Sequence, residues 1–143
     1  MNVIWGTVVV ALSLLAWAGQ TLSWLAPSTA VRLQLMEAED EVDPTFWADI
    51  RAEALWDAVT LWVMAAAGVL LIADVAEWPY FGLVGGGIYL YFGGRGISTR
   101  ITMTRLGIRI GTPESVRTGV IFLVLWGVMA LITIAAAIVA LES

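Results

Sequence analysis

An uncharged segment at the start of the chain limits the possible folds more than any other feature. Residues 3–25 contain no acidic or basic side chain, and Trp5 and Trp24 lie near the two ends. As a helix this segment would be about 35 Å long, enough to cross the roughly 30 Å hydrocarbon core of a bilayer. A secretory signal peptide is the alternative, but no basic residue precedes the apolar run, which is also longer than a signal core. We therefore predict a retained transmembrane helix over residues 3–25.

The remainder of the chain is equally apolar. Of its 143 residues, 60% are hydrophobic and only 13% are charged, which exceeds what a soluble domain of this size can bury. Further spans are predicted over residues 55–76, 79–94 and 116–141, and Pro79 suits the first turn of its helix. The fold class expected is all-α: a polytopic membrane protein with four transmembrane helices in a single domain, residues 1–143.

Two segments between the spans are expected to lie outside the bilayer. Asp43 before Pro44 is typical of a helix start, so the second transmembrane helix should extend back to about residue 44. Residues 95–112 read differently, because apolar side chains alternate with polar ones and with glycine. That period of two predicts an irregular or hairpin-like loop with short strands around Arg105 to Gly107.

The basic residues predict the orientation in the membrane. The chain has no lysine, and four crossings would place all seven arginines on one side. They are Arg32, Arg51, Arg95, Arg100, Arg105, Arg109 and Arg117. The positive-inside rule assigns that side to the cytoplasm, with both termini outside the cell (inner or plasma) membrane.

An acidic loop is expected on the same side as the arginines. It consists of Glu37, Glu39, Asp40, Glu41 and Asp43. The loop arginines Arg95, Arg100, Arg105 and Arg109 can contact either anionic lipid headgroups or this acidic loop, and we favour the acidic loop.

The residue inventory excludes several kinds of chemistry. Cysteine and histidine are absent, so disulfides, thiol nucleophiles and the usual zinc or copper ligands are excluded, and we expect no metal and no cofactor. The net charge of −5 argues against nucleic acid as a partner, because phosphate binding needs a basic surface. Membrane lipids and other membrane proteins remain as expected partners.

The third predicted span is rich in glycine. Gly82, Gly85, Gly86 and Gly93 are candidate helix-packing residues, with Gly82 and Gly86 in a GxxxG pattern that lets two backbones approach closely in lipid. A flexible hinge lining a pore is the alternative. We favour packing, because no charged residue accompanies the glycines.

A few polar residues in or beside the spans could form a polar path or an ion site. The candidates are Ser13, Gln20, Thr60, Asp74 and Glu77. We favour interhelical hydrogen bonding for Ser13 and Gln20, and a solvated helix end for Asp74 and Glu77, over this polar path.

Three functions follow from these features. The first is a non-enzymatic structural or accessory subunit that packs through the glycine-rich helix in a homo-oligomer or a larger membrane complex. The second is an oligomeric channel or transporter that uses the polar path. The third is a lipid-modifying membrane enzyme, which we rank last because no two acids are spaced to reach one reacting atom.

Overall fold

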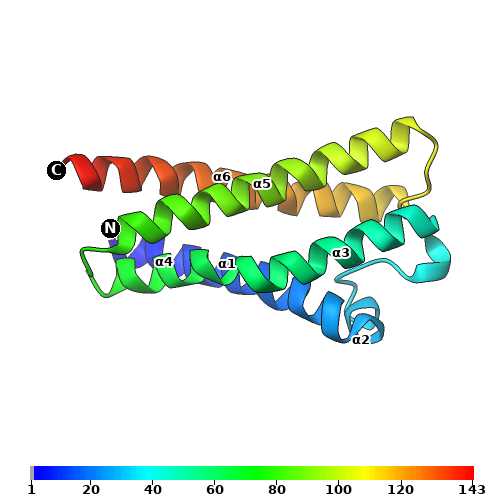
Figure 1. Cartoon of the computed structure of the whole chain (residues 1–143), viewed down its shortest axis with the longest axis horizontal. Coiled ribbons are helices and arrows are strands. Elements are labelled where there is room, and N and C mark those ends of the chain that lie inside the picture. Colours follow the sequence, from blue (N-terminus) through cyan, green and yellow to red (C-terminus); the bar gives the residue numbers. More distant parts are fainter. Residues whose placement is uncertain (1) are drawn as a thin grey trace.

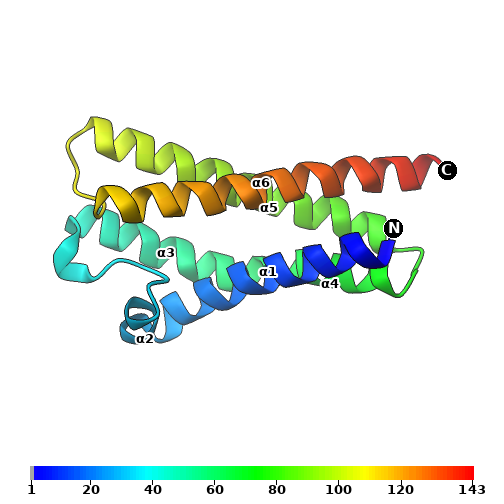
Figure 2. The same cartoon turned by 180° about the vertical axis from the view of Figure 1, so that it is seen from behind.

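The computed structural model describes residues 2–143, and this part of the chain is helical with no strand (Figure 1). The elements are α1 (Asn2–Leu25), α2 (Pro27–Arg32), a 3-10 turn (Glu39–Glu41), α3 (Pro44–Thr60), α4 (Trp62–Ile72), α5 (Trp78–Arg105) and α6 (Pro113–Glu142). The long helices lie side by side as rods, and α3 and α4 follow one another along a single rod (Figures 1 and 2).

The connections divide the bundle into two ends. The N-terminus, the C-terminus and the turn between α4 and α5 lie at one end, called the terminal end here (Figure 1). At the opposite end, α1 and α5 finish and α3 and α6 begin. All seven arginines lie in this second half or in its connections, so we call it the arginine end.

Three helices are long and apolar enough to cross a membrane: Asn2–Leu25, Pro44–Ile72 and Pro113–Glu142. They correspond to the first, second and fourth predicted spans. The third predicted span lies in α5, which has 28 residues and is not among these three.

The second rod ends earlier than its predicted end at residue 76. Only Leu61 separates α3 from α4, and its amide still donates to the Asp57 carbonyl at 2.9 Å, so the rod is nearly continuous. After Ile72 the chain turns because Asp74 takes a left-handed conformation, with φ of 54°. The amides of Asp74 and Val75 donate back to the last turn, which is the hydrogen-bond pattern of a Schellman cap.

The predicted hairpin within residues 95–112 is wrong. α5 continues as a helix to Arg105 and is closed by Gly107, whose φ is +74°. The amide of Ile108 donates to the Met103 carbonyl at 2.9 Å, and that of Gly107 to the Thr104 carbonyl at 3.1 Å, again a Schellman cap. Only the residues after this cap are irregular. The alternation that suggested strands therefore combines the last turns of a helix with a short extended connection.

Two apolar clusters hold the rods together. The larger one runs along the middle of the bundle and includes Leu61, Met64, Tyr89 and Met129. The smaller one, at the arginine end, joins the start of α3 to the end of α5 through Phe46. Its other members are Val42 and Ile110, with Trp47, Ile50, Met103, Ile108 and Val116 packed around them. The connection after α5 is thus anchored by burial and not by strand pairing.

Candidate functional site

A charged cluster joins α3 to α5 at the arginine end. The Arg95 guanidinium donates to both carboxylate oxygens of Asp49, at 2.6 and 3.2 Å. The same guanidinium lies 3.2 Å from Glu53. Asp49 and Glu53 are four residues apart on α3, so they share one face of that helix. Within residues 2–143 these are the only ion pairs, and they connect α5 to the rod formed by α3 and α4.

Asp57 extends this acidic face one turn deeper into the bundle. It is only 5% exposed, and its Oδ2 has no hydrogen-bond partner among the described residues. A buried carboxylate without a partner is costly unless a cation lies nearby, and Arg95 is the cation close enough to interact with it. The cluster therefore holds three acids and one arginine.

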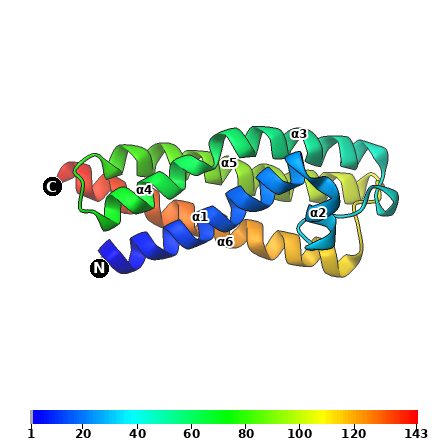
Figure 3. The ribbon, with the colours of Figure 1, turned by 90° about the horizontal axis from the view of Figure 1, so that it is seen from below.

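A cleft opens between α1 and α6 toward the arginine end. The two helices meet where the Trp126 indole N–H donates to the Leu12 carbonyl at 2.9 Å. From there they diverge, as Figure 3 shows. The space between them has a volume of about 680 Å³. Its apolar lining includes the buried side chains of Phe92 and Leu123, whereas many of its other lining residues are polar. The polar lining residues are Gln20, Gln34, Glu37, Glu41, Arg100, Thr112, Glu114, Ser115 and Thr118.

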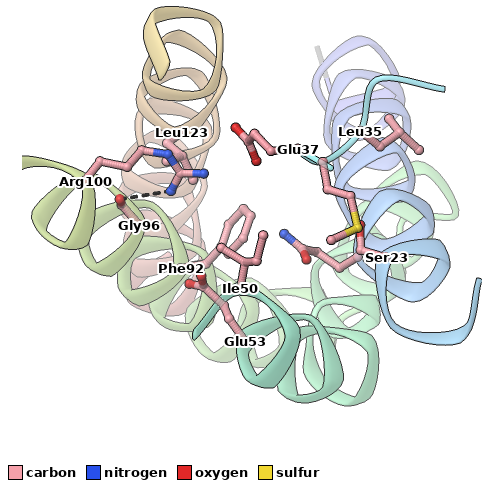
Figure 4. A pocket seen from close by; sticks show the side chains of 11 residues that line it. Ser23, Leu35, Glu37, Ile50, Glu53, Phe92, Gly96, Arg100 and Leu123 are labelled. Atoms are coloured by element: carbon pink, nitrogen blue, oxygen red, sulfur yellow. Dashed lines mark hydrogen bonds between the residues drawn. The ribbon is translucent and has the colours of Figure 1, made fainter. Parts of the chain in front are cut away.

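A smaller cavity of about 60 Å³ adjoins the cleft and shares Arg100 and Glu37 with it. In Figure 4 these two side chains approach the opening from opposite sides, Arg100 from α5 and Glu37 from the loop after α2. Arg100 donates to the Gly96 carbonyl at 3.0 Å and lies over the Phe46 ring at 5.8 Å. Glu37 accepts a hydrogen bond from the Ser115 hydroxyl at 2.7 Å. Arg100 thus lines the cleft without forming an ion pair within the described chain.

The residues of the predicted polar path do not lie together. Ser13 is buried, and its hydroxyl donates to the Val9 carbonyl of its own helix. The Thr60 hydroxyl donates to the Trp56 carbonyl at 2.9 Å, also within its helix. Gln20 lines the cleft near the arginine end.

Asp74 and Glu77 lie in the exposed turn between α4 and α5, at the terminal end. They are therefore separated from Gln20 by most of the length of the bundle. Asp74 caps α4 through its left-handed backbone, and Glu77 directly precedes α5. No cluster of three or more metal-ligating side chains occurs among residues 2–143.

Gly82, Gly85, Gly86 and Gly93 are all buried against helices of the same chain. A Cβ at Gly85 would lie 2.9 Å from Met64 of α4, and one at Gly93 would lie 2.9 Å from the Leu123 carbonyl oxygen of α6. Gly82 and Gly86 likewise face α6. These glycines are thus occupied by contacts inside the bundle.

Gly87 and Gly94, in contrast, face outward from α5. A Cβ at either position would meet nothing within 4 Å. Beside them on the same helix face are exposed tyrosines, with Tyr80 at 60% and Tyr91 at 64% exposure. α5 therefore carries two sets of glycines: one set packs inside the bundle, and the other set is exposed on the outer face of the helix.

The acidic loop contacts the segment after α5 through its backbone. The Asp43 amide donates to the Arg109 carbonyl at 2.8 Å, and the Arg109 side chain donates to the Asp40 carbonyl at 3.1 Å. The acids and arginines of these two segments form no ion pair within residues 2–143. Arg105 is exposed on the last turn of α5.

The Arg95 cluster was not predicted, although the sequence contains a signal for it. Asp49, Glu53 and Asp57 recur every four residues on one helix, and Arg95 is the first charge after the apolar part of α5. Such spacing places three acids in line on one helix face. The cleft has no signal of this kind, because it depends on how α1 and α6 diverge.

Comparison with known proteins adds no assignment. No protein-family model matches the chain, and neither the curated proteins nor the solved structures contain a match to it.

Proposed function

We propose that this chain is a non-enzymatic integral membrane protein with four spans that acts as a structural subunit and assembles with further copies of itself through the outer face of α5. The observation that carries the proposal is the open surface around Gly87 and Gly94. The glycine-rich helix α5 remains the proposed packing element. The glycines proposed to contact a partner are the exposed Gly87 and Gly94, and not the glycines that are buried inside the bundle.

The inclusion of α5 among the spans rests on its surroundings. It packs between α4 and α6, and each of these belongs to a rod that is long and apolar enough to cross a membrane. From Trp78 to Gly94 it carries no charge, and its first charged residue, Arg95, is paired with Asp49 and Glu53. A helix packed along two transmembrane neighbours over this length crosses with them. Both termini are then outside and the arginine end is cytoplasmic.

The outer face of α5 has the spacing of a helix–helix seam. We use this name for Tyr80, Val84, Gly87, Tyr91, Gly94 and Ser98, all of which are exposed. Their spacing alternates between four and three residues, as at the core positions of a coiled coil. Small residues at such positions let transmembrane helices approach closely, and a seven-residue repeat favours a left-handed crossing.

A second copy of the chain is the partner that this face fits best. The seam carries large knobs, such as Tyr91, and small holes, Gly87 and Gly94, about one turn away on either side. Two identical faces can therefore interlock, because the knob of each copy meets a hole of the other, as an isologous contact requires. Assembly would also remove the tyrosine side chains from hydrocarbon.

Cysteine cross-linking tests the proposal cleanly, because the natural chain has no cysteine. Single variants Val84→Cys and Tyr91→Cys should give disulfide-linked dimers in native membranes. Val128→Cys, equally apolar and 48% exposed but on α6, is the matched control and should stay monomeric. Gly94→Leu should abolish the cross-link at position 84 by filling the hole.

Two results would overturn this function. One is equal cross-linking from α6 and α5, or none from either. The other is a closed ring that conducts ions in proteoliposomes, because that result would favour the channel. Gly127→Leu, another glycine with open space around it, controls for the effect of adding a leucine to a span.

A further inference from the structure

The cleft between α1 and α6 has the polarity of an amphiphile, with an apolar floor and a polar mouth. We infer that it is a binding site for a membrane phospholipid, whose phosphate contacts Arg100 and whose hydrocarbon chains lie against α1 and α6. This site is separate from the α5 seam.

Arg100 is positioned for an anion: it forms no ion pair within residues 2–143, although Glu37 and Glu53 line the smaller cavity with it. Its guanidinium is held by the Gly96 carbonyl on one side and by the Phe46 ring, which is buried in the smaller apolar cluster. The helix opposite has a glycine at this point, and a Cβ at Gly119 would lie 3.4 Å from the Arg100 Nε. An arginine side chain has five N–H donors, and in Arg100 only Nη1 donates a hydrogen bond in the structure. The remaining donors suit a phosphate, which arginine binds in bidentate fashion.

The apolar part of the cleft continues from this point toward the middle of the bundle. Trp126 closes its floor through the hydrogen bond to Leu12. Leu15 of α1 and Phe122 of α6 line the cleft and are 48% and 39% exposed, so they form the two lips of a lateral opening. In a bilayer, that opening faces lipid. The volume of about 680 Å³ accommodates a headgroup and the first part of its chains, and the rest can remain in the bilayer.

The acids around the mouth narrow the choice of headgroup. Glu37, Glu41 and Glu114 line the same cleft as Arg100. Their negative charge opposes a second charge on the ligand, so a phosphodiester with a single charge is favoured over a phosphomonoester, which carries nearly two. Glu37 is also restrained by its hydrogen bond to Ser115 of α6.

Native mass spectrometry of the purified full-length protein in detergent tests the site. The probes are phosphatidylglycerol, phosphatidic acid and a phosphate-free diacyl glycolipid, all with the same chains. Phosphatidylglycerol should bind more tightly than the other two. Arg100→Gln should weaken its binding about tenfold and remove its advantage over the glycolipid. Arg105→Gln, which removes an exposed arginine on the same helix, should leave binding unchanged.

Gly119→Leu provides a second route if Arg100→Gln does not fold. It fills the space in front of the guanidinium without changing any charge, and it should also abolish the preference for phosphatidylglycerol. The inference fails if phosphatidylglycerol binds equally well to the natural chain, Arg100→Gln and Gly119→Leu. It also fails if cysteines placed at Leu15 and Phe122 cross-link between copies, because the cleft would then hold a second chain. Neither result depends on the α5 seam.

Discussion

Asp74 has a backbone conformation that most side chains avoid. Its φ of 54° lies in the left-handed region, where a Cβ crowds the following carbonyl and costs most residues about 1–2 kcal/mol. Aspartate tolerates this region better than most residues, and the position closes the Schellman cap of α4. Asp74 therefore has a structural role in ending the helix, through its backbone conformation.

Substitution of Asp74 tests this role. Asp74→Val should destabilise the bundle by about 1–2 kcal/mol, because a β-branched residue is strained at positive φ. Asp74→Gly should be neutral or slightly stabilising. The unfolding free energy in detergent measures both effects. Ala73→Val is the matched control, since Ala73 is exposed next to it with an ordinary φ of −79°, and equal losses at the two positions would contradict the interpretation.

At the scale of elements, helix starts are clearer in the sequence than helix ends. Asp43 before Pro44 is a predicted start, and its side chain accepts a hydrogen bond from the first turn. Thr112 before Pro113 has the same pattern, and its side chain accepts one too. The ends are harder to predict because a Schellman cap requires only one left-handed residue, and at the end of α4 that residue is Asp74 and not a glycine. At the end of α5 this residue is Gly107, and a glycine is the usual sequence signal for a helix end.

The same reasoning explains the limits of the site prediction. Glycines of α5 could be recognised as packing residues, but one sequence cannot tell which of them face α6 and which face outward. That depends on how α5 is rotated against its neighbours. The acidic stripe on α3 was visible in principle, since its spacing is local. The cleft was not, because Leu15, Arg100 and Trp126 come together only in the folded bundle.

The cap of α3 should make the start of this helix sensitive to acid. The Thr45 amide donates to the Asp43 carboxylate at 2.8 Å, and this hydrogen bond, together with the nearby Arg109 charge, lowers the pKa of Asp43. Because the folded pKa lies below the unfolded value, the cap contributes fully above about pH 4 and is lost as the pH falls through the folded pKa.

Amide exchange at Thr45 and Phe46 measures this effect. In the natural chain, protection should decrease with acidification over that range. Asp43→Asn keeps a capping oxygen that does not ionise, so its protection should not change with pH after correction for intrinsic exchange. Asp43→Ala should lack the protection at every pH. If Asp43→Asn retained the full acid sensitivity, another group would be responsible.

At the scale of the whole molecule, the division into a terminal end and an arginine end supports the topology proposed above. Both chain ends and the α4–α5 turn lie together, and every arginine lies in the opposite half. A guanidinium is costly to move across hydrocarbon, so seven of them in one half strongly favour keeping that half in the cytoplasm. The acids of the same half do not oppose this, because they contribute little to orientation.

Single cysteines test this topology without background labelling, since the chain has none of its own. Ser143→Cys and Ala76→Cys, both exposed at the terminal end, should react with a membrane-impermeant maleimide in intact cells. Ser28→Cys and Leu106→Cys, exposed at the arginine end, should react only after permeabilisation. Labelling of Ser143→Cys and Ala76→Cys from opposite sides would mean that α5 and α6 do not both cross, and labelling of Leu106→Cys in intact cells would reverse the orientation. The first result would contradict the proposed assembly, because the seam can join copies only if α5 crosses the membrane. The second would leave the seam in the bilayer and would change only the side assigned to the arginine end.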